Sequence, residues 1–128
     1  MIRFTKQLPH PLPNEISVTS VLAALSDPIR LAILATLVKY GECKWSEFDV
    51  PVCKSTLSHH MRVLREAGLL QHRREGTRCW VSLRSDLSRD FPGLLDTVLV
   101  LAAREPDLEQ LFGDLSRRPV EEPVEEPA

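Results

Sequence analysis

In the first half of the chain, apolar residues recur every three or four positions, which is the spacing of a helix that buries one face. This pattern over residues 18–25 predicts a short first helix that ends near Ser26. Asp27 and Pro28 then supply an N-cap followed by a proline at the first helical position, and the apolar run up to Gly41 predicts a buried second helix. Residues 42–50 are weakly periodic and predict one or two further helical turns.

The next segment predicts an amphipathic helix. Ser55 can cap its N-terminus, and the apolar residues Leu57, Met61 and Leu64 follow at spacings that place them on one face. Gly68 follows the last helical position and suits the left-handed residue that often ends a helix. We therefore expect a helix with one buried face and one polar, exposed face.

Beyond this helix, the spacing of apolar residues changes from helical to alternating. Residues 71–74 and 78–83 predict two strands joined by a short loop that contains Gly76. On the second strand, the residues that share the face toward the core are Cys79, Val81 and Leu83. Pro92 can begin the last long helix, and a break at residues 105–106 separates it from a small final helix over residues 107–115.

This order of elements is that of a winged helix-turn-helix, a mainly α (α+β) fold in which the two-stranded hairpin forms the wing. The last long helix is apolar around more of its circumference than one small core can cover, through Leu94, Leu95, Val98, Leu99, Leu101 and Ala102. A second copy of the chain would cover this surface, so we expect a homodimer.

Prolines mark both ends of the chain. Three of them fall within residues 9–13, and the C-terminal end repeats Val-Glu-Glu-Pro twice. These compositions predict an N-terminal arm over residues 1–14, one folded domain over residues 15–115 and an acidic disordered tail over residues 116–128. No apolar run reaches the roughly 18 to 20 residues of a membrane span, and no secretory signal is evident, so we expect a cytoplasmic protein with no membrane partner.

The charge of the chain is unevenly distributed, although its net value at pH 7 is only −2. Residues 54–84 hold seven basic and two acidic side chains, whereas residues 85–128 hold four basic and eleven acidic ones. This asymmetry suggests that the basic segment meets a polyanion. A basic face that is merely solvated is the alternative, and charge alone does not exclude it.

The polar face of the amphipathic helix combines short hydrogen-bonding groups with long cations, which suit base edges and phosphates in a major groove. The hairpin adds cations on a projecting loop that can lie along a phosphate backbone or minor groove. The candidate contacts with double-stranded DNA are Lys54, Ser55, Thr56, Ser58, His59 and Arg62 on the helix and Arg73, Arg74, Thr77 and Arg78 on the wing.

Three motifs resemble those of the ArsR/SmtB family of bacterial dimeric winged-helix repressors. They are Leu25-Ser26-Asp27-Pro28-Ile29-Arg30-Leu31, the helix that begins Lys54-Ser55-Thr56-Leu57-Ser58-His59-His60, and Arg73-Arg74-Glu75-Gly76-Thr77. The resemblance covers about residues 18–100. It implies a homodimer formed through the first and last long helices, which binds a two-fold symmetric operator and leaves it when an inducer is sensed. The operator contacts it implies are Lys54, Ser55, Ser58 and His59, with the wing at residues 73–78.

Metal-responsive members of that family carry a Cys-x-Cys pair soon after the second helix. In this chain the two corresponding positions hold Lys44 and Ser46, and neither a cation nor a single hydroxyl replaces a thiolate ligand. The family's other metal site uses histidines on the last long helix, but every histidine here precedes residue 73. We therefore expect no metal and no cofactor. The inducer stays open between an oxidant, an electrophile, an organic ligand and a metal held by other residues.

The three cysteines differ in their surroundings. Cys79 alternates with apolar residues, which indicates a buried thiol. Cys53 lies beside Lys54 just before the amphipathic helix, where the helix N-terminus and the cation both favour a thiolate. Cys53 is therefore a candidate redox sensor, with Cys43 as a candidate disulfide partner. The equal alternative is that both thiols only fill the core.

The remaining polar residues indicate no enzyme, because the Ser and His side chains share one helix face without a third group to orient them. We expect His59 to point outward toward DNA and His60 to pack inward, and we expect His10 and His72 to be exposed to solvent. The alternative function is a winged helix that docks a protein and shows no specific duplex binding.

Overall fold

The computed structural model describes residues 8–114, so the first seven residues and the acidic tail predicted over residues 116–128 lie outside the described part of the chain. In chain order the described elements are η1 (Pro13–Glu15), α1 (Val18–Ala24), α2 (Pro28–Tyr40), β1 (Cys43–Lys44), η2 (Trp45–Glu47), α3 (Lys54–Glu66), β2 (Leu70–Glu75), β3 (Arg78–Leu83), α4 (Leu87–Asp90), α5 (Leu94–Ala102) and α6 (Pro106–Asp114). This is the predicted winged helix-turn-helix, with α3 as its amphipathic helix and β2–β3 as its wing.

Helix α2 begins and ends where the sequence predicts. The Asp27 carboxylate accepts hydrogen bonds from the backbone N–H groups of Ile29 and Arg30, at 2.8 and 3.1 Å, and Pro28 occupies the first helical position. Gly41 ends the helix with φ +79°, a conformation that favours glycine. The predicted burial of this helix is confirmed, because its core side chains come from several faces, namely Leu31, Ala32, Ile33, Leu34, Thr36 and Leu37.

Helix α3 begins earlier than the sequence predicts. Cys53, with an extended backbone at φ −75° and ψ 168°, is the N-cap residue, and Ser55 is already the second residue of the helix. The expectation that Ser55 caps the helix is therefore wrong. The chain enters the helix immediately after Cys53, so the first turn contains both Ser55 and Thr56.

The inner face of α3 and its C-terminal end follow the predicted pattern. Leu57, Met61 and Leu64 are buried. Gly68 has φ +92°, and a Cβ atom at this position would lie 2.5 Å from Cδ1 of Ile16. A glycine is therefore required both for the turn after α3 and for the close approach of the N-terminal segment.

The sheet has the order β1-β3-β2 and is antiparallel throughout. In the hairpin, Glu75 pairs with Arg78, which leaves a two-residue loop with Gly76 at φ +63°. Strand β1 is only two residues long and pairs Cys43 with Val81. It occupies part of the segment over residues 42–50 for which the sequence predicts one or two helical turns. The sequence does not reveal this strand, because two residues are too few to show an alternation of apolar and polar positions.

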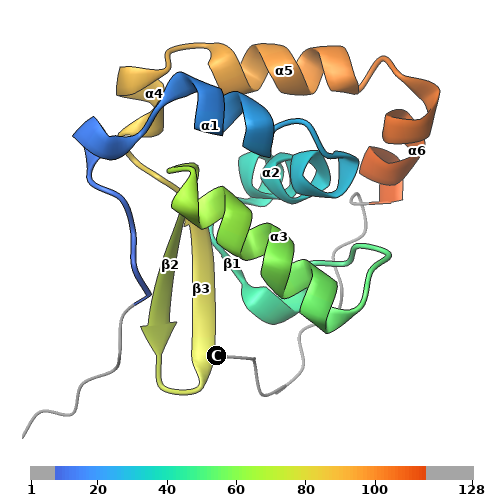
Figure 1. Ribbon diagram of the computed structural model, residues 1–128. Helices are drawn as coiled ribbons and strands as arrows, with labels where there is room; N and C mark the ends of the chain where they lie inside the picture. The colour runs from blue at the N-terminus through green and yellow to red at the C-terminus, as the bar shows by residue number, and fades with distance from the viewer. Residues whose placement is uncertain (1–7, 115–128) are drawn as a thin grey trace, which may run out of the picture.

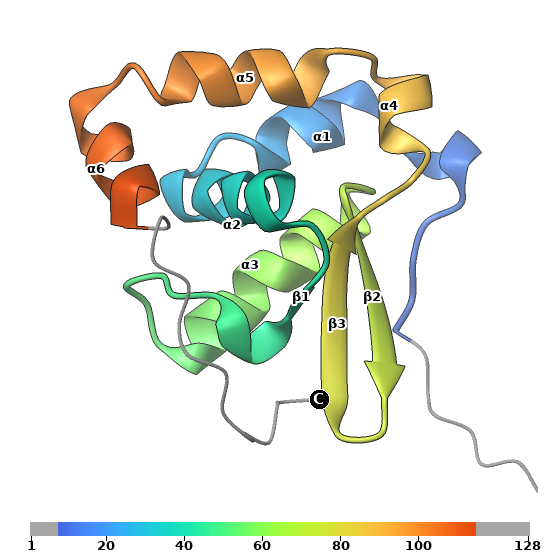
Figure 2. The ribbon, with the colours of Figure 1, turned by 180° about the vertical axis from the view of Figure 1, so that it is seen from behind.

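Helix α2 lies at the centre of the molecule, between α3 on one side and α1 and α5 on the other (Figure 1). The tip of the wing and helix α5 lie at opposite ends, as the reverse view also shows (Figure 2). One contiguous core joins these layers, and its fully buried side chains include Val21, Ile33, Leu34, Met61, Leu64, Leu69, Leu70 and Val81. In the described residues, no single helix is long and apolar enough to cross a membrane, and α1 and α2 would reach that length only as a pair bent by 98°.

The N-terminal segment before η1 is held against the wing and α3. Arg65 Nε donates to the Pro9 carbonyl at 3.1 Å, and Arg84 Nη1 donates to the Pro11 carbonyl at 2.7 Å. Between them, the backbone N–H of His72 donates to Nε2 of His10 at 3.0 Å. The described end of the predicted N-terminal arm therefore packs along strand β2.

This packing corrects the expectation that His10 and His72 are exposed to solvent. His72 is only 4% exposed and His10 is partly buried. Strand β2 begins at Leu70, so the alternation of the strand places His72 on the same inward face as Leu70.

The C-terminal half contains one helix that the sequence did not indicate and one that begins later than expected. Helix α4 follows the hairpin directly, and α5 begins at Leu94 after Gly93, which has φ +76°. Pro92 is therefore not the first residue of the last long helix.

Candidate nucleic-acid interface

The polar side of α3 carries all six helix residues that the sequence singles out as DNA contacts. Four of them are exposed, and two, Thr56 and Ser58, are partly buried where the helix approaches its neighbours. Arg62 Nη2 donates to Nδ1 of His59 at 3.5 Å, which holds these two side chains together on the exposed face. The exposed members are Lys54, Ser55, His59 and Arg62. This row offers cations and hydrogen-bonding groups to one side of the helix, as a helix that enters a major groove requires.

His60 attaches α3 to the start of α2. Arg30 Nη1 donates to Nδ1 of His60 at 3.1 Å, while Arg30 Nε donates to the Ala24 carbonyl at 2.7 Å. Because a guanidinium only donates, the His60 proton belongs on Nε2, which lies 4.0 Å from Oδ1 of Asp27. Burial lowers the pKa of His60, and this neutral state keeps the Arg30 bond intact. The inward orientation predicted for His60 is confirmed.

The first turn of α3 surrounds the exposed thiol of Cys53. Its Sγ lies 3.3 Å from the Ser55 hydroxyl and 3.3 Å from the Thr56 hydroxyl. Hydrogen bonds from these hydroxyl groups lower the pKa of Cys53 to about 6. At neutral pH the sulfur is therefore a thiolate in contact with two of the predicted DNA-contact residues.

Cys43 and Cys79 have a different environment, since both are buried, and none of the three cysteines forms a disulfide. Cys79 faces the core from β3, as the strand alternation predicts. Cys43 lies in β1, where its thiol donates to the Gly41 carbonyl at 3.3 Å. Within residues 8–114, no three His, Cys, Asp or Glu side chains gather in a way that could hold a metal ion.

The wing is less cationic than its sequence suggests. Arg73 forms ion pairs with Glu42 at 3.2 Å and with Glu75 at 3.5 Å, and its guanidinium stacks over the Trp80 ring at 5.5 Å from the centroid. Trp80 Nε1 also donates to Glu75 at 3.2 Å. The other predicted wing contacts are Arg74, which is partly buried, and the exposed Thr77 and Arg78.

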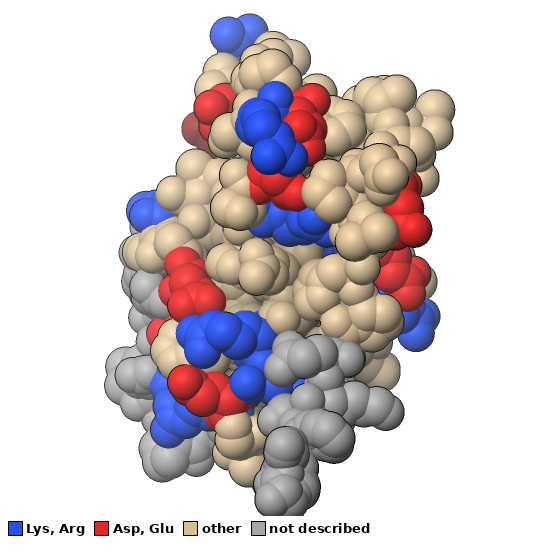
Figure 3. Space-filling model, turned by 90° about the vertical axis from the view of Figure 1, so that its left-hand side faces the viewer, with Lys and Arg blue, Asp and Glu red and all other residues tan. Residues whose placement is uncertain are grey.

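Figure 3 shows Lys and Arg side chains directly beside Asp and Glu side chains in the lower half of the molecule, where the hairpin lies. Glu42, which pairs with Arg73, lies 31 positions before it in the chain. The neutralisation of Arg73 by Glu42 therefore does not follow from the local sequence. Of the two predicted DNA-binding surfaces, the polar side of α3 is therefore more clearly basic than the wing at Arg73.

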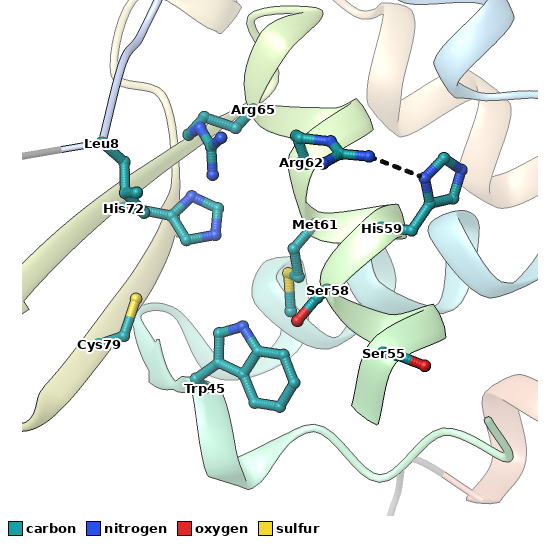
Figure 4. A pocket seen from close by; sticks show the side chains of 10 residues that line it. All are labelled: Leu8, Trp45, Ser55, Ser58, His59, Met61, Arg62, Arg65, His72 and Cys79. Carbon is teal, nitrogen blue, oxygen red and sulfur yellow. Dashed lines mark hydrogen bonds between the residues drawn. The ribbon is translucent and has the colours of Figure 1, made fainter. Parts of the chain in front are cut away.

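A cavity of about 300 Å³ opens between α3 and the sheet. Figure 4 shows the side chains of Trp45 and Met61 on one side of it and those of Arg65 and His72 on another. Sequence reasoning missed these residues as a group. Two local signals were available, because Arg65 follows the spacing of the buried face of α3 and His72 alternates with Leu70.

Comparison with known proteins agrees with this geometry. The sequence profile described as "Bacterial regulatory protein, arsR family" matches residues 27–72, which run from the cap of α2 into β2. The chain is 39% identical over 82 residues to the uncharacterized HTH-type transcriptional regulator YceK of Bacillus subtilis, covering 61% of this chain and 82% of that protein. It is 32% identical over 79 residues to an uncharacterized HTH-type transcriptional regulator of Methanocaldococcus jannaschii, covering 59% of this chain and 88% of that protein.

A third relative is a homologue of the cadmium resistance transcriptional regulatory protein CadC from Staphylococcus aureus. Identity is 34% over 73 residues, which cover 55% of this chain and 60% of that protein. The fold, the family profile and these relatives agree with one another. The chain therefore belongs to the ArsR family of bacterial regulatory proteins and is a DNA-binding transcriptional regulator rather than an enzyme.

Proposed function

We propose that this chain is a homodimeric repressor that reads its operator with the polar side of α3 and leaves the DNA when an inducer is sensed. The observation that carries the proposal is the row of exposed polar and basic side chains on α3, whose opposite face is fixed in the core by Leu57, Met61 and Leu64. The contacts assigned to the operator are Lys54, Ser55, Thr56, Ser58, His59 and Arg62 on α3, with Arg73, Arg74, Thr77 and Arg78 on the wing.

Large apolar side chains support the homodimer. At the end of the molecule opposite the wing tip, α1 exposes Val18 and Leu22, and α5 exposes Val100 and Leu101, each by about half of its surface. Exposed apolar surface of this kind is typical of an interaction site. Two copies joined here would present their α3 helices to half-sites about 34 to 36 Å apart, or one turn of DNA.

Operator binding is tested with the DNA upstream of the protein's own gene, titrated at several salt concentrations. We expect Arg62→Ala to weaken binding about tenfold and to reduce the salt slope by about one if Arg62 contacts a phosphate. Arg89→Ala is the matched control, because Arg89 is exposed on α4 and its guanidinium donates to the neighbouring Asp90. Binding that is absent or independent of salt would instead indicate a winged helix that docks a protein.

Cys53 is proposed as the sensor of an oxidant. Its thiolate would attack one oxygen of hydrogen peroxide and break the O–O bond, which forms a sulfenic acid and releases hydroxide that takes a proton from solvent to give water. The modified sulfur could no longer accept both hydroxyl hydrogen bonds in the same way, so the first turn of α3 would change where it contacts DNA. Cys43 is assigned no part in this step, because its thiol is buried and bonded to the Gly41 carbonyl.

We expect peroxide to release the wild-type protein from the operator and a reductant to restore binding. Cys53→Ser should bind the operator in both conditions, and Cys79→Ser serves as the control for a thiol that is buried. A Cys53→Ser protein that still leaves the DNA after peroxide treatment would exclude this sensor. An electrophoretic or fluorescence-anisotropy titration measures each case.

A further inference from the structure

The cavity between α3 and the sheet is lined by a buried histidine, His72. His72 is 4% exposed, and neither of its ring nitrogens has a hydrogen-bond partner among the described residues. Its ring extends from β2 toward α3 (Figure 4). Buried polar groups are nearly always hydrogen-bonded in native proteins, so this ring is set up to bond to something that enters the cavity. A neutral imidazole offers one donor and one acceptor for that purpose.

Arg65 gives the same cavity a cation. Arg65 is buried, and among the described residues its Nε donates to the Pro9 carbonyl. In the described part of the chain Arg65 makes no ion pair, and none of the residues that line the cavity is acidic. A guanidinium has five N–H donors, and beside a neutral imidazole it favours a carboxylate, which can accept from both groups.

The remaining walls are suited to a planar apolar group. The indole of Trp45 and the thioether of Met61 face the same space as Arg65 and His72 (Figure 4). The volume of about 300 Å³ lies at the lower end of the range for small-molecule sites. Aromatic and sulfur-containing side chains pack well against aromatic rings.

We propose that this cavity binds a small aromatic carboxylate, with the carboxylate between Arg65 and His72 and the ring against Trp45 and Met61. The proposal rests on the proposed function in one respect, since it makes this ligand an inducer. Ser58 and Arg62 line the cavity and also belong to the surface assigned to the operator. The ligand and the operator would therefore compete for these residues, and each would weaken the binding of the other by the same factor.

Ligand binding is tested first on the protein alone, in reducing buffer so that Cys53 stays reduced. In a Trp80→Phe background, Trp45 is the remaining tryptophan and its emission reports on the cavity. We expect benzoate to change this emission saturably with a Kd below about 1 mM. Benzamide, which lacks the charge, and inorganic phosphate, which lacks the ring, should each bind at least about tenfold more weakly.

The site is assigned with two substitutions and one control. His72→Phe and Arg65→Gln should each weaken benzoate binding at least about tenfold, whereas Arg89→Gln should leave it unchanged. The thermal unfolding of each variant shows whether it is folded. A change in the NMR shift of the His72 ring protons on benzoate addition locates the binding site in the wild-type protein, without any substitution. Absence of saturable benzoate binding, or equal binding in His72→Phe, would overturn the proposal.

The operator titration separates this proposal from the proposed function. We expect saturating benzoate to weaken operator binding at least about fivefold in the wild type and not in His72→Phe. Benzoate binding by a protein that binds no duplex would retain the cavity proposal and refute the repressor. Phosphate binding as tight as benzoate would mean that the cavity receives a phosphate of the DNA backbone, which would also overturn the aromatic ligand.

Discussion

Replacing Leu101 with aspartate is expected to convert the proposed dimer into monomers and to lower operator affinity by about 100-fold or more. Leu101 is 50% exposed on the outer side of α5, where it continues the apolar surface of Val100. A carboxylate placed in this surface would have to be desolvated in the dimer without a partner, which strongly opposes association. A monomer would then bind one half-site at a time and lose the gain from the second.

Sedimentation measures the oligomeric state of Leu101→Asp, and the operator titration measures its affinity. Gln110→Asp is the matched control, because Gln110 is exposed on α6 and the substitution adds the same charge outside the apolar surface. A wild-type protein that sediments as a monomer at micromolar concentration would contradict the homodimer. So would a Leu101→Asp protein that keeps both its mass and its affinity.

Acidification is expected to destabilise the protein through His72. Burial, which is the largest cause, and the nearby charges of Arg65 and His10 together lower the pKa of this imidazole to about 4. The unfolded chain therefore takes up the proton near pH 6.5, well before the folded protein does. The free energy of unfolding should fall by about 2 to 3 kcal/mol between about pH 7.5 and about pH 4.5 for this reason.

The His72→Phe variant isolates this contribution. Phenylalanine fills a similar volume, keeps the backbone N–H that bonds to His10 and cannot titrate. We expect its unfolding free energy, measured by urea denaturation across the pH range, to fall less steeply than that of the wild type below about pH 6.5. Identical profiles for the two proteins would show that the His72 side chain titrates as it does in water. The two proteins differ only at residue 72, since Cys79 of β3 and Arg65 of α3, which line the same cavity, are unchanged in the variant.

Elements set by local signals could be predicted from the sequence. The cap at Asp27, the spacing of Leu57, Met61 and Leu64, and the glycine in the hairpin loop each act within a few residues, so the pattern alone locates α2, α3 and the wing. The inward position of His60 follows from the same helical spacing. The N-cap of α3 is Cys53, two residues before the predicted Ser55. Serine is a preferred N-cap residue type, but the extended backbone that precedes the helix is that of Cys53.

Features that depend on distant segments could not be predicted in this way. The burial of His72 requires both α3 and the N-terminal segment, since Arg65 and His10 are distant from each other in the sequence. The ion pair between Glu42 and Arg73 joins the segment after α2 to the wing. Strand β1 is two residues long, and only its pairing with β3 defines it.

The contacts of Pro9, His10 and Pro11 have a consequence for solubility. Strand β2 is an edge strand of the sheet, and an open edge strand can recruit a strand from another molecule and begin aggregation. The His10 ring occupies the outward N–H of His72, and the prolines on either side of it have no N–H to offer. The segment thus blocks strand addition at the root of the wing. None of the contacts that this segment makes in the described part of the chain reaches Gly76 at the tip of the hairpin.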